Sequence, residues 1–168
     1  MALRIGIITI SDRSARGERE DESGPALEKV ILEQGWIVTS REIVPDDKLE
    51  IQLKLISWSD SGKIDVILTT GGTGFSPRDI TPEATGEVIQ RFAPGLTEAM
   101  RLAGLKITPH AMLSRAVAGI RGSTLIVNLP GSPKGAVENL EVILPILPHA
   151  VQLLSDPVKA ESGHRKIH

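Results

Sequence analysis

Three features are scarce or absent in this sequence of 168 residues, and each absence excludes a class of protein. There is no cysteine, which excludes disulfides, thiolate metal ligands and cysteine nucleophiles and fits a reducing compartment. Aromatic residues make up only 2%, so stacking platforms for single-stranded nucleic acid are missing. No apolar run approaches the roughly 20 residues that span a bilayer. We therefore expect a cytoplasmic protein that binds neither nucleic acid nor membranes.

The composition that remains is that of an ordinary globular domain, with 40% hydrophobic and 24% charged residues. The formal net charge of -2 provides no global attraction for polyanions, so local positive groups must hold any anionic ligand. The chain length suits one core. We expect a single domain over residues 1–155, followed by a loose polar tail over 156–168.

Strand and helix patterns alternate along the chain, which is typical of βαβ crossovers and a parallel sheet. The segment 3–10 is almost continuously apolar and β-branched, as in a strand covered on both faces. A helix through Leu27, Val30 and Ile31 follows, with Gly35 as its C-terminal cap. Further strands are expected over 36–44, 66–70 and 124–129.

The remaining helices are expected over 47–59, 81–92 and 96–105, and from about 133 with a kink near Pro145 and Pro148. In the first of these, Leu49, Leu53 and Ile56 are the expected apolar positions. The pair 94–95, Pro-Gly, should stop the second helix, and 120–122 should form a turn.

The most informative segment is a glycine-rich loop that directly follows the strand 66–70. Its glycines let the backbone approach an anion closely, as in loops that bind phosphate. The spacing matches neither the dinucleotide-binding fingerprint nor the Walker pattern, so an ordinary turn is an equally good interpretation by glycine content alone. The candidate residues for binding a phosphate or a pterin are Thr70, Gly71, Gly72, Thr73 and Gly74.

The residues after this loop favour the anion-binding interpretation. Ser76, Arg78 and Asp79 place a hydroxyl, a guanidinium and a carboxylate before a helix that Thr81 is expected to cap. Ser76, Arg78 and Thr81 are further candidates for binding the substrate or nucleotide. A carboxylate beside a phosphate site needs a cation between them, and Mg²⁺ binds through one or two carboxylates, water and substrate phosphates. For Asp79 alone, a solvated loop acid or a helix cap is the alternative.

A second acidic pair follows the strand 36–44. Asp47 is the natural capping or first-turn acid of the next helix. Asp46 then needs another role, and it could share Mg²⁺ with Asp79 because the carboxyl ends of parallel strands converge. For Asp46 alone, a helix-start acid is again the alternative.

The end of the first strand offers two further binding candidates, Ser11 and Asp12. The charged stretch 13–22 after them is most simply a solvated loop, although its length also permits a mobile flap. The four histidines show no metal-ligand spacing, which favours surface or core positions.

The last candidate segment leaves the strand 124–129 by a rigid turn and delivers a hydroxyl, exposed amides and a lysine to a helix start. Lys134 suits a phosphate ligand. Upstream of that strand lie a serine and an arginine, although a single arginine is usually a surface residue. The candidate binding residues of this part of the chain are Ser114, Arg115, Asn128, Pro130, Gly131, Ser132 and Lys134.

Together these segments resemble the molybdopterin adenylyltransferase family, which includes bacterial MogA and MoaB proteins and the N-terminal domain of gephyrin. The run 69–85, TTGGTGFSPRDITPEAT, is highly specific to this superfamily. The resemblance does not cover the tail after Asp156. The other matching pieces follow in order through most of the chain, at 11–13, 21–27, 44–47, 65–68, 94–101, 113–121 and 124–134.

The resemblance implies a three-layer αβα domain that forms a homotrimer and transfers AMP from ATP to molybdopterin, releasing pyrophosphate. It matches Asp46 and Asp79 to the family's two catalytic aspartates, for which Mg²⁺ is the expected metal. Ser114 matches the family's serine in the pterin-side pocket, and the glycine loop matches its cradle for nucleotide and pterin phosphates. The molybdenum insertase is a further partner to be considered.

Two alternatives to this function stay open at the level of sequence. A nucleotide pyrophosphatase of the competence-damage type would carry a leucine and a following proline around the glycine loop, where this chain has Thr73 and Phe75. A pterin-binding carrier or scaffold without catalysis is the other, although no long linker or second domain is visible. Which side of the pocket holds adenine and which holds the pterin is also open.

Overall fold

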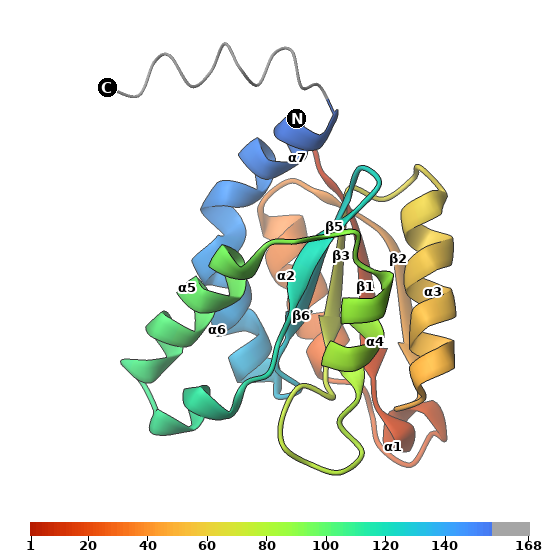
Figure 1. Cartoon of the computed structure of the whole chain (residues 1–168), viewed down its shortest axis with the longest axis vertical. Coiled ribbons are helices and arrows are strands. Elements are labelled where there is room, and N and C mark those ends of the chain that lie inside the picture. The colour runs from red at the N-terminus through yellow and green to blue at the C-terminus, as the bar shows by residue number, and fades with distance from the viewer. Residues whose placement is uncertain (156–168) are drawn as a thin grey trace.

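A six-stranded sheet lies at the centre of the structure, a computed structural model that describes residues 1–155 (Figure 1). The strand order is β2-β1-β3-β6-β5-β4, and the first four of these strands are parallel, whereas β5 and β4 form an antiparallel edge. Helices cover both faces, which confirms the expected three-layer α/β fold. The predicted polar tail, 156–168, lies outside the described residues. The strands are β1 (Arg4–Ile10), β2 (Ile37–Val44), β3 (Val66–Thr70), β4 (Arg91–Phe92), β5 (Ala118–Arg121) and β6 (Thr124–Leu129).

The central strands are buried on both faces, as their uninterrupted apolar sequences predict. Every residue of β3 and of β6 is buried. In β1, Ile5 and Ile7 pack into one core cluster, while Ile8 and Ile10 pack into the other. The alternation of side chains along each strand thus divides the core into two layers.

One face of the sheet is covered by the helices at both ends of the chain, where Leu27, Ile31 and Leu140 contribute to the core. On the other face, the ring of Trp58 occupies the space beside Gly6, where a Cβ atom would lie 2.7 Å from the ring. The first face carries α2 (Ser23–Glu33), α5 (Pro94–Leu105), α6 (Pro133–Ile143), the 3₁₀ turn η2 (Leu144–Ile146) and α7 (Leu147–Ser155), and the second carries α3 (Lys48–Asp60) and α4 (Thr81–Val88).

Helix α3 begins where the sequence predicts, because the Asp47 side chain accepts a hydrogen bond from the Glu50 amide and caps the helix. Of the three apolar positions predicted to be buried, Ile56 packs partly buried against the core, and the other two were wrong. Leu49 and Leu53 are 62% and 57% exposed. The buried positions are Ile51, Leu55, Trp58 and Ser59.

The antiparallel edge of the sheet also differs from the prediction. The expected turn at 120–122 is the end of β5, and only Gly122, with φ 56°, lies in the turn itself. Helix α4 ends at Val88, and 91–92 pairs with β5 as β4. Pro94 starts α5 instead of stopping a helix, since proline fits the first helical turn.

The helical stretch Pro133–Ser155 is 23 residues long and contains an 18-residue window with a mean hydropathy of 1.2, so it could cross a membrane by length and composition alone. It is not an uninterrupted apolar run, because Lys134, Glu138 and Glu141 lie within it. The predicted break occurs at η2, which contains Pro145, while Pro148 lies in the first turn of α7. A single helix of this kind is a weak argument for a membrane span. Several of its apolar residues pack into the core of the domain, namely Ala136, Leu140, Ile143, Leu147 and Val151.

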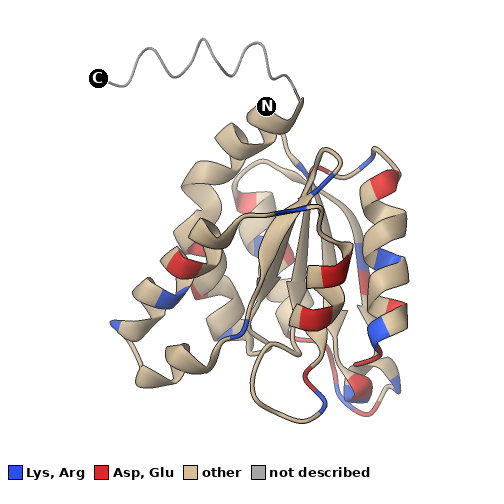
Figure 2. Ribbon diagram, in the orientation of Figure 1, with Lys and Arg blue, Asp and Glu red and all other residues tan. Residues whose placement is uncertain are grey.

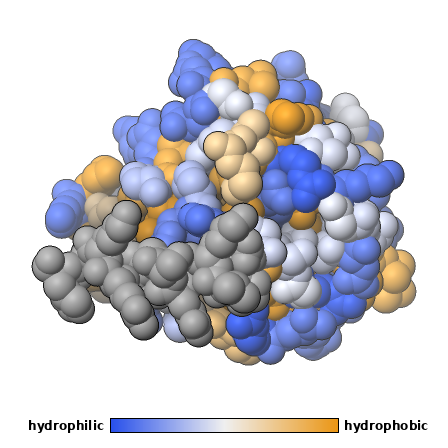
Figure 3. All heavy atoms as spheres, turned by 90° about the horizontal axis from the view of Figure 1, so that it is seen from above, coloured by the Kyte–Doolittle hydropathy of each residue, from blue (hydrophilic) through white to orange (hydrophobic). Residues whose placement is uncertain are grey.

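The loops after β1, β2, β3 and β6 meet at the lower end of the molecule in Figure 1. The backbones of three of these strand ends approach closely there. Gly71 has φ 108°, and a Cβ atom on it would lie 2.2 Å from the Ile10 carbonyl oxygen. A Cβ on Gly131 would lie 3.2 Å from the Gly71 Cα. The sheet reverses its strand order between β1 and β3, which is where ligands bind in open α/β sheets. The opposite end, seen in Figure 3, shows a mixture of hydrophilic and hydrophobic surface.

Candidate active site

Two clefts lie side by side at the carboxyl ends of the parallel strands. The first has a volume of about 380 Å³ and the second about 490 Å³. Their shared edge consists of Gly72, Asp79, Gly131 and Ser132. The first cleft extends beneath the loop that follows β1, and the second lies between the glycine loop, α5 and the 3₁₀ helix η1 (Pro109–Leu113).

The glycine loop between these clefts is held by hydrogen bonds on the side that faces the protein interior. Thr70 donates its hydroxyl hydrogen to the Pro130 carbonyl at 2.6 Å. Thr81, expected to cap α4 and to bind a ligand, is fully buried within the helix, whose N-cap residue is Ile80. Its hydroxyl donates to the Gly71 carbonyl at 2.9 Å and its amide to the Gly72 carbonyl at 3.1 Å. Thr81 therefore fixes the loop and faces neither cleft.

Three backbone amides of the loop have no acceptor within the described part of the protein and are available to a ligand. Within residues 1–155, no protein acceptor takes the amide hydrogens of Gly72, Thr73 or Gly74. The N-terminus of α6 points to the same edge, where the Ser132 hydroxyl caps the helix by accepting the Gly135 amide hydrogen at 3.1 Å. Successive free amides and a helix N-terminus together form an anion-binding surface.

Asp46 and Asp79 face the first cleft from the loops after β2 and β3. A Cβ atom on Gly72 would lie 3.1 Å from an Asp46 carboxylate oxygen, and one on Gly74 would lie 2.9 Å from an Asp79 oxygen. The glycine loop therefore runs between the two carboxylates. Burial raises the pKa of Asp46, and the negative charges of Asp12 and Asp79 add to the rise.

Asp12 and Asp46 join the first two loops through reciprocal hydrogen bonds. The Asp12 amide donates to the Asp46 carboxylate at 2.9 Å, and the Asp46 amide donates to the Asp12 carboxylate at 3.0 Å. Arg78 connects the loop after β3 to these two loops. Its guanidinium donates to the Asp12 carboxylate at 2.7 Å and to the Asp46 carbonyl at 3.2 Å. The guanidinium of Arg78 lowers the pKa of Asp12. Asp12 and Arg78 therefore position the loops, and neither side chain lines a cleft.

The two carboxylates at the cleft fit the expected Mg²⁺. They are hard oxygen ligands, and within residues 1–155 neither forms an ion pair with a side chain. No group of three or more aspartate, glutamate, histidine or cysteine ligands is present in this part of the chain. Mg²⁺ binds through one or two carboxylates and keeps water and substrate phosphates as its other ligands, so the pair Asp46 and Asp79 could hold it.

The second cleft contains Ser114, whose hydroxyl oxygen accepts the Ala116 amide hydrogen at 3.3 Å and can donate its own hydrogen to a ligand. Arg101 lies beside it and donates to the Ser114 and Ala116 carbonyls. Met100, Ile107 and other apolar side chains make this cleft less polar than the first, which suits a planar heterocycle.

The structure brings most of the sequence-predicted residues to the clefts and places others outside them. Asn128 is fully buried and donates to the hydroxyls of Thr69 and Thr85, each at 2.9 Å. Lys134 is exposed, with a loose pair to Glu138 at 3.8 Å. Ser76 lies in the exposed part of the glycine loop. The predicted residues that line a cleft are Ser11, Asp46, Thr70, Gly71, Gly72, Thr73, Gly74, Asp79, Ser114, Pro130, Gly131 and Ser132.

Residues that the sequence did not single out also line the clefts. The stretch interpreted as a solvated loop contains the short helix α1 (Asp12–Ala15) and contributes 19–22 to the first cleft. The Asp21 side chain there is only 5% exposed and accepts hydrogen bonds from Thr9 and the Gly24 amide. His110 lines the second cleft. Asp21 stands among other charged residues, so the local sequence does not distinguish it from them. Only the family resemblance over 21–27 indicated that this segment matters.

Comparison with known proteins identifies the class to which this fold and site belong. Residues 6–149 match a family described as a probable molybdopterin binding domain. The chain is 45% identical over 90% of its length to a molybdopterin adenylyltransferase of Helicobacter pylori, of which it covers 88%. It is 44% identical over 96% of its length to gephyrin of Dictyostelium discoideum, but it spans only 24% of that longer protein.

Among solved structures, the fold is similar to the molybdopterin biosynthesis enzyme MoaB of Thermus thermophilus, with a TM-score of 0.86 and 54% identity. The match covers 91% of this chain and 96% of that one. The chain therefore belongs to the molybdopterin adenylyltransferase family, as its motifs predicted. Members of this family are enzymes of molybdenum cofactor biosynthesis.

Proposed function

We propose that this chain transfers AMP from ATP to the terminal phosphate of molybdopterin and releases pyrophosphate. The observation that carries the proposal is the edge shared by the two clefts, where the free Gly72 amide and the Asp79 carboxylate lie, with Asp46 beside it in the first cleft. Two polyanionic substrates must meet at one phosphorus atom in this reaction. A cleft on each side of a single anion-binding edge provides that arrangement.

The two clefts differ in the substrate that each suits. The second cleft contains Ser114, which matches the pterin-side serine of the family, and its apolar walls suit the pterin ring. We therefore assign the pterin to the second cleft and the nucleotide to the first, where the hydroxyls of Ser11, Ser14 and Ser23 line the wall. Both substrates then direct their phosphates toward the shared edge.

The chemistry requires little from protein acids and bases. The nucleophile is the pterin's own phosphate oxygen, which is ionised at neutral pH, so no general base is needed. The amides of Gly72 to Gly74, the α6 N-terminus and Lys134 offset the charge of the phosphates. Asp46 and Asp79 would hold Mg²⁺, which supplies positive charge at the departing pyrophosphate when bound. The phosphate oxygen forms a new bond to the α-phosphorus as the bond to pyrophosphate breaks.

The deciding experiment is an assay of pyrophosphate release with ATP, Mg²⁺ and molybdopterin. Release that requires the pterin supports the proposal. Release without the pterin would instead indicate a nucleotide pyrophosphatase, and pterin binding without release would indicate a carrier.

We also propose that the protein acts in the cytoplasm. The lack of cysteine supports this location. An interaction with the molybdenum insertase is tested by co-purification.

We also propose a homotrimer, because α5 buries only Thr97 and Met100 in the described chain while Leu102 is 65% and Leu105 is 41% exposed. The exposed apolar side chains on this helix suit contact with another copy of the chain. Light scattering should give three times the mass of the chain. A stable monomer at micromolar concentration would contradict this assembly.

A further inference from the structure

Arg115 was a candidate substrate ligand, but each of its three side-chain nitrogens already donates to another part of the protein. Nε donates to the Gly74 carbonyl at 2.7 Å, and Nη2 donates to the Asp79 carbonyl at 3.0 Å. Nη1 donates to the Glu83 carboxylate on α4. The Arg115 amide also donates to the Thr73 carbonyl at 2.9 Å. Arg115 lines neither cleft.

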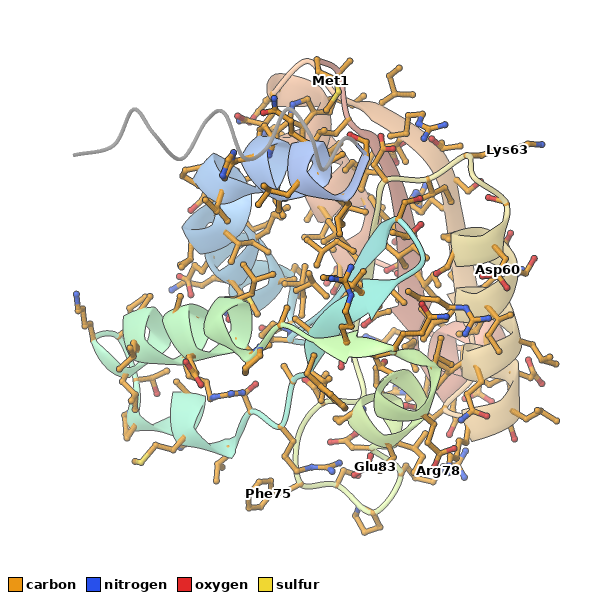
Figure 4. All side chains as sticks on the ribbon, turned by 45° about the horizontal axis from the view of Figure 1, so that its top comes forward. Met1, Asp60, Lys63, Phe75, Arg78 and Glu83 are labelled. Carbon is orange, nitrogen blue, oxygen red and sulfur yellow. The ribbon has the colours of Figure 1, made fainter. Side chains whose placement is uncertain are left out.

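These contacts close a segment of the chain that carries a catalytic candidate. Gly74 and Asp79 flank the exposed part of the loop, residues 75–78, which begins with Phe75 (Figure 4). Within the loop, the Asp79 carboxylate accepts only the Ser76 amide hydrogen, at 3.2 Å. The Asp79 amide also donates to the Ser76 carbonyl at 2.9 Å, so the guanidinium is the contact that ties the Asp79 backbone to Gly74 at the other end of this part of the loop.

The same contacts connect the two clefts. Ser114, the residue before Arg115, lines the second cleft, whereas Asp79 lies at the edge shared with the first. A movement of the segment at 114–115 would consequently move Asp79.

We propose that Arg115 is a positioning residue that holds the Asp79 carboxylate at the shared edge, and that it controls turnover without contacting either substrate. This inference rests on the proposed function. It predicts that a lysine cannot replace Arg115. The ammonium keeps the charge, but it cannot donate to Gly74, Asp79 and Glu83 in one plane.

The test compares Arg115→Lys with wild type and with a matched control. Arg121→Lys changes an arginine that also donates to a backbone carbonyl, that of Val88, and to a carboxylate, that of Asp60, at the far end of the domain. We expect Arg115→Lys to lower kcat by about 10- to 100-fold, the effect of misplacing a catalytic group by about 1 Å. The calorimetric dissociation constants for ATP and molybdopterin should stay within about twofold, and Arg121→Lys should keep wild-type kcat.

Two further measurements separate positioning from a purely structural role. The affinity of the protein and nucleotide together for Mn²⁺, followed by electron paramagnetic resonance, should fall in Arg115→Lys because Asp79 is displaced. In an Asp79→Asn background, adding Arg115→Lys should change kcat by less than about twofold, since groups that act as a unit are not additive. All assays are run below the melting temperature of each variant.

The outcomes distinguish this inference from the proposed function. If Asp79→Asn abolishes turnover while Arg115→Lys retains wild-type kcat, the positioning role is overturned and the proposed function stands. Weakened substrate binding with unchanged kcat would make Arg115 a ligand and also overturn the inference. If Asp79→Asn keeps wild-type turnover, the proposed function itself loses its catalytic aspartate. Should Arg115→Lys fail to fold, Glu83→Ala removes one acceptor at an exposed position, and unchanged kcat in that variant would equally overturn the role.

Discussion

Two aspartates at the amino end of the parallel sheet have arginine partners, whereas two aspartates that face the first cleft at the carboxyl end do not. At the amino end, Asp65 accepts from Arg4 at 2.7 Å and Asp60 accepts from Arg121 at 2.9 Å. At the carboxyl end, neither Asp46 nor Asp79 has an ion-pair partner among residues 1–155. Figure 2 shows acidic and basic residues at both ends, so the difference lies in pairing and not in the number of charges.

The pKa values follow this difference. The Arg121 guanidinium lowers the pKa of Asp60, whereas burial raises the pKa of Asp46. A paired carboxylate stabilises the fold, while an unpaired, partly buried one reduces the free energy of unfolding until a cation arrives. The pairs at the amino end therefore contribute to stability, as the Asp12–Arg78 pair does at the carboxyl end, whereas Asp46 and Asp79 keep their negative charge available for a ligand.

The largest expected effect is on turnover in Asp46→Asn and Asp79→Asn. Each change removes a negative charge at nearly constant volume, so we expect turnover to fall by about 100-fold or more with the fold retained. If both carboxylates hold one ion, the double variant should be hardly worse than either single variant. The measurement is the adenylylation rate against Mg²⁺ concentration, together with thermal melts. Wild-type rates in both single variants would rule out the metal site.

The next effect concerns Lys134, a cation at the carboxyl end that is not committed to a buried partner. Its side chain is 82% exposed and 3.8 Å from Glu138. Lys134→Ala should weaken binding of ATP or molybdopterin by about tenfold, the lower end of a charge-assisted contact of roughly 1.5–3 kcal/mol. Calorimetry measures this directly. Unchanged affinity for both ligands would show that Lys134 only flanks the site.

A smaller effect is expected in the pH dependence of stability, where Asp12 and Asp46 should act with opposite signs. Because the pKa of Asp12 is lowered, its stabilisation is present above about pH 4 and is lost as the pH falls through the lowered value. Because the pKa of Asp46 is raised, its protonated form is favoured in the fold, and that contribution is lost as the pH rises through the raised value.

Urea unfolding between about pH 3 and pH 7 without Mg²⁺ tests both signs. Asp12→Asn should lose less stability on acidification than wild type. Asp46→Asn should be at least as stable as wild type near neutral pH, because it removes an uncompensated charge and keeps an oxygen that can accept the Asp12 amide hydrogen. A clear loss of stability in Asp46→Asn at neutral pH would contradict the comparison between the two ends.

The smallest effect is expected at the amino end. Asp60→Asn breaks an exposed ion pair, so the melting temperature should fall only slightly and turnover should not change. The same assay and melts used for Asp46→Asn measure it. Reduced turnover in Asp60→Asn would show that the two ends are coupled.

Sequence reasoning identified the central strands well, because β3 and β6 are short, buried and bounded by clear turn residues. It failed where tertiary contacts decide between equal local patterns. In α3, leucines and isoleucines occur on more than one face, and only packing against the sheet selects Ile51 and Leu55 over Leu49 and Leu53. The short strand at 91–92 exists through its pairing with β5, a non-local contact that its sequence does not indicate.

The candidate site divides in the same way. Asp46, Asp79 and the glycine loop were found because they directly follow strands, where the fold itself predicts a ligand. The supporting roles of Thr81, Asn128 and Arg115 could not be inferred, since each depends on which carbonyl or hydroxyl lies opposite in three dimensions. A polar residue type alone does not reveal whether it faces a ligand or holds a loop.

The close approach of Gly71 to the Ile10 carbonyl limits how the substrate range of this enzyme could be re-engineered. Any side chain at Gly71 would push β1 and β3 apart, because its Cβ would lie 2.2 Å from that oxygen. Gly71 lines the first cleft, so the strain would fall on the binding site itself. The outer walls are better targets for directed evolution, with 19–22 bordering the first cleft and 107–113 bordering the second.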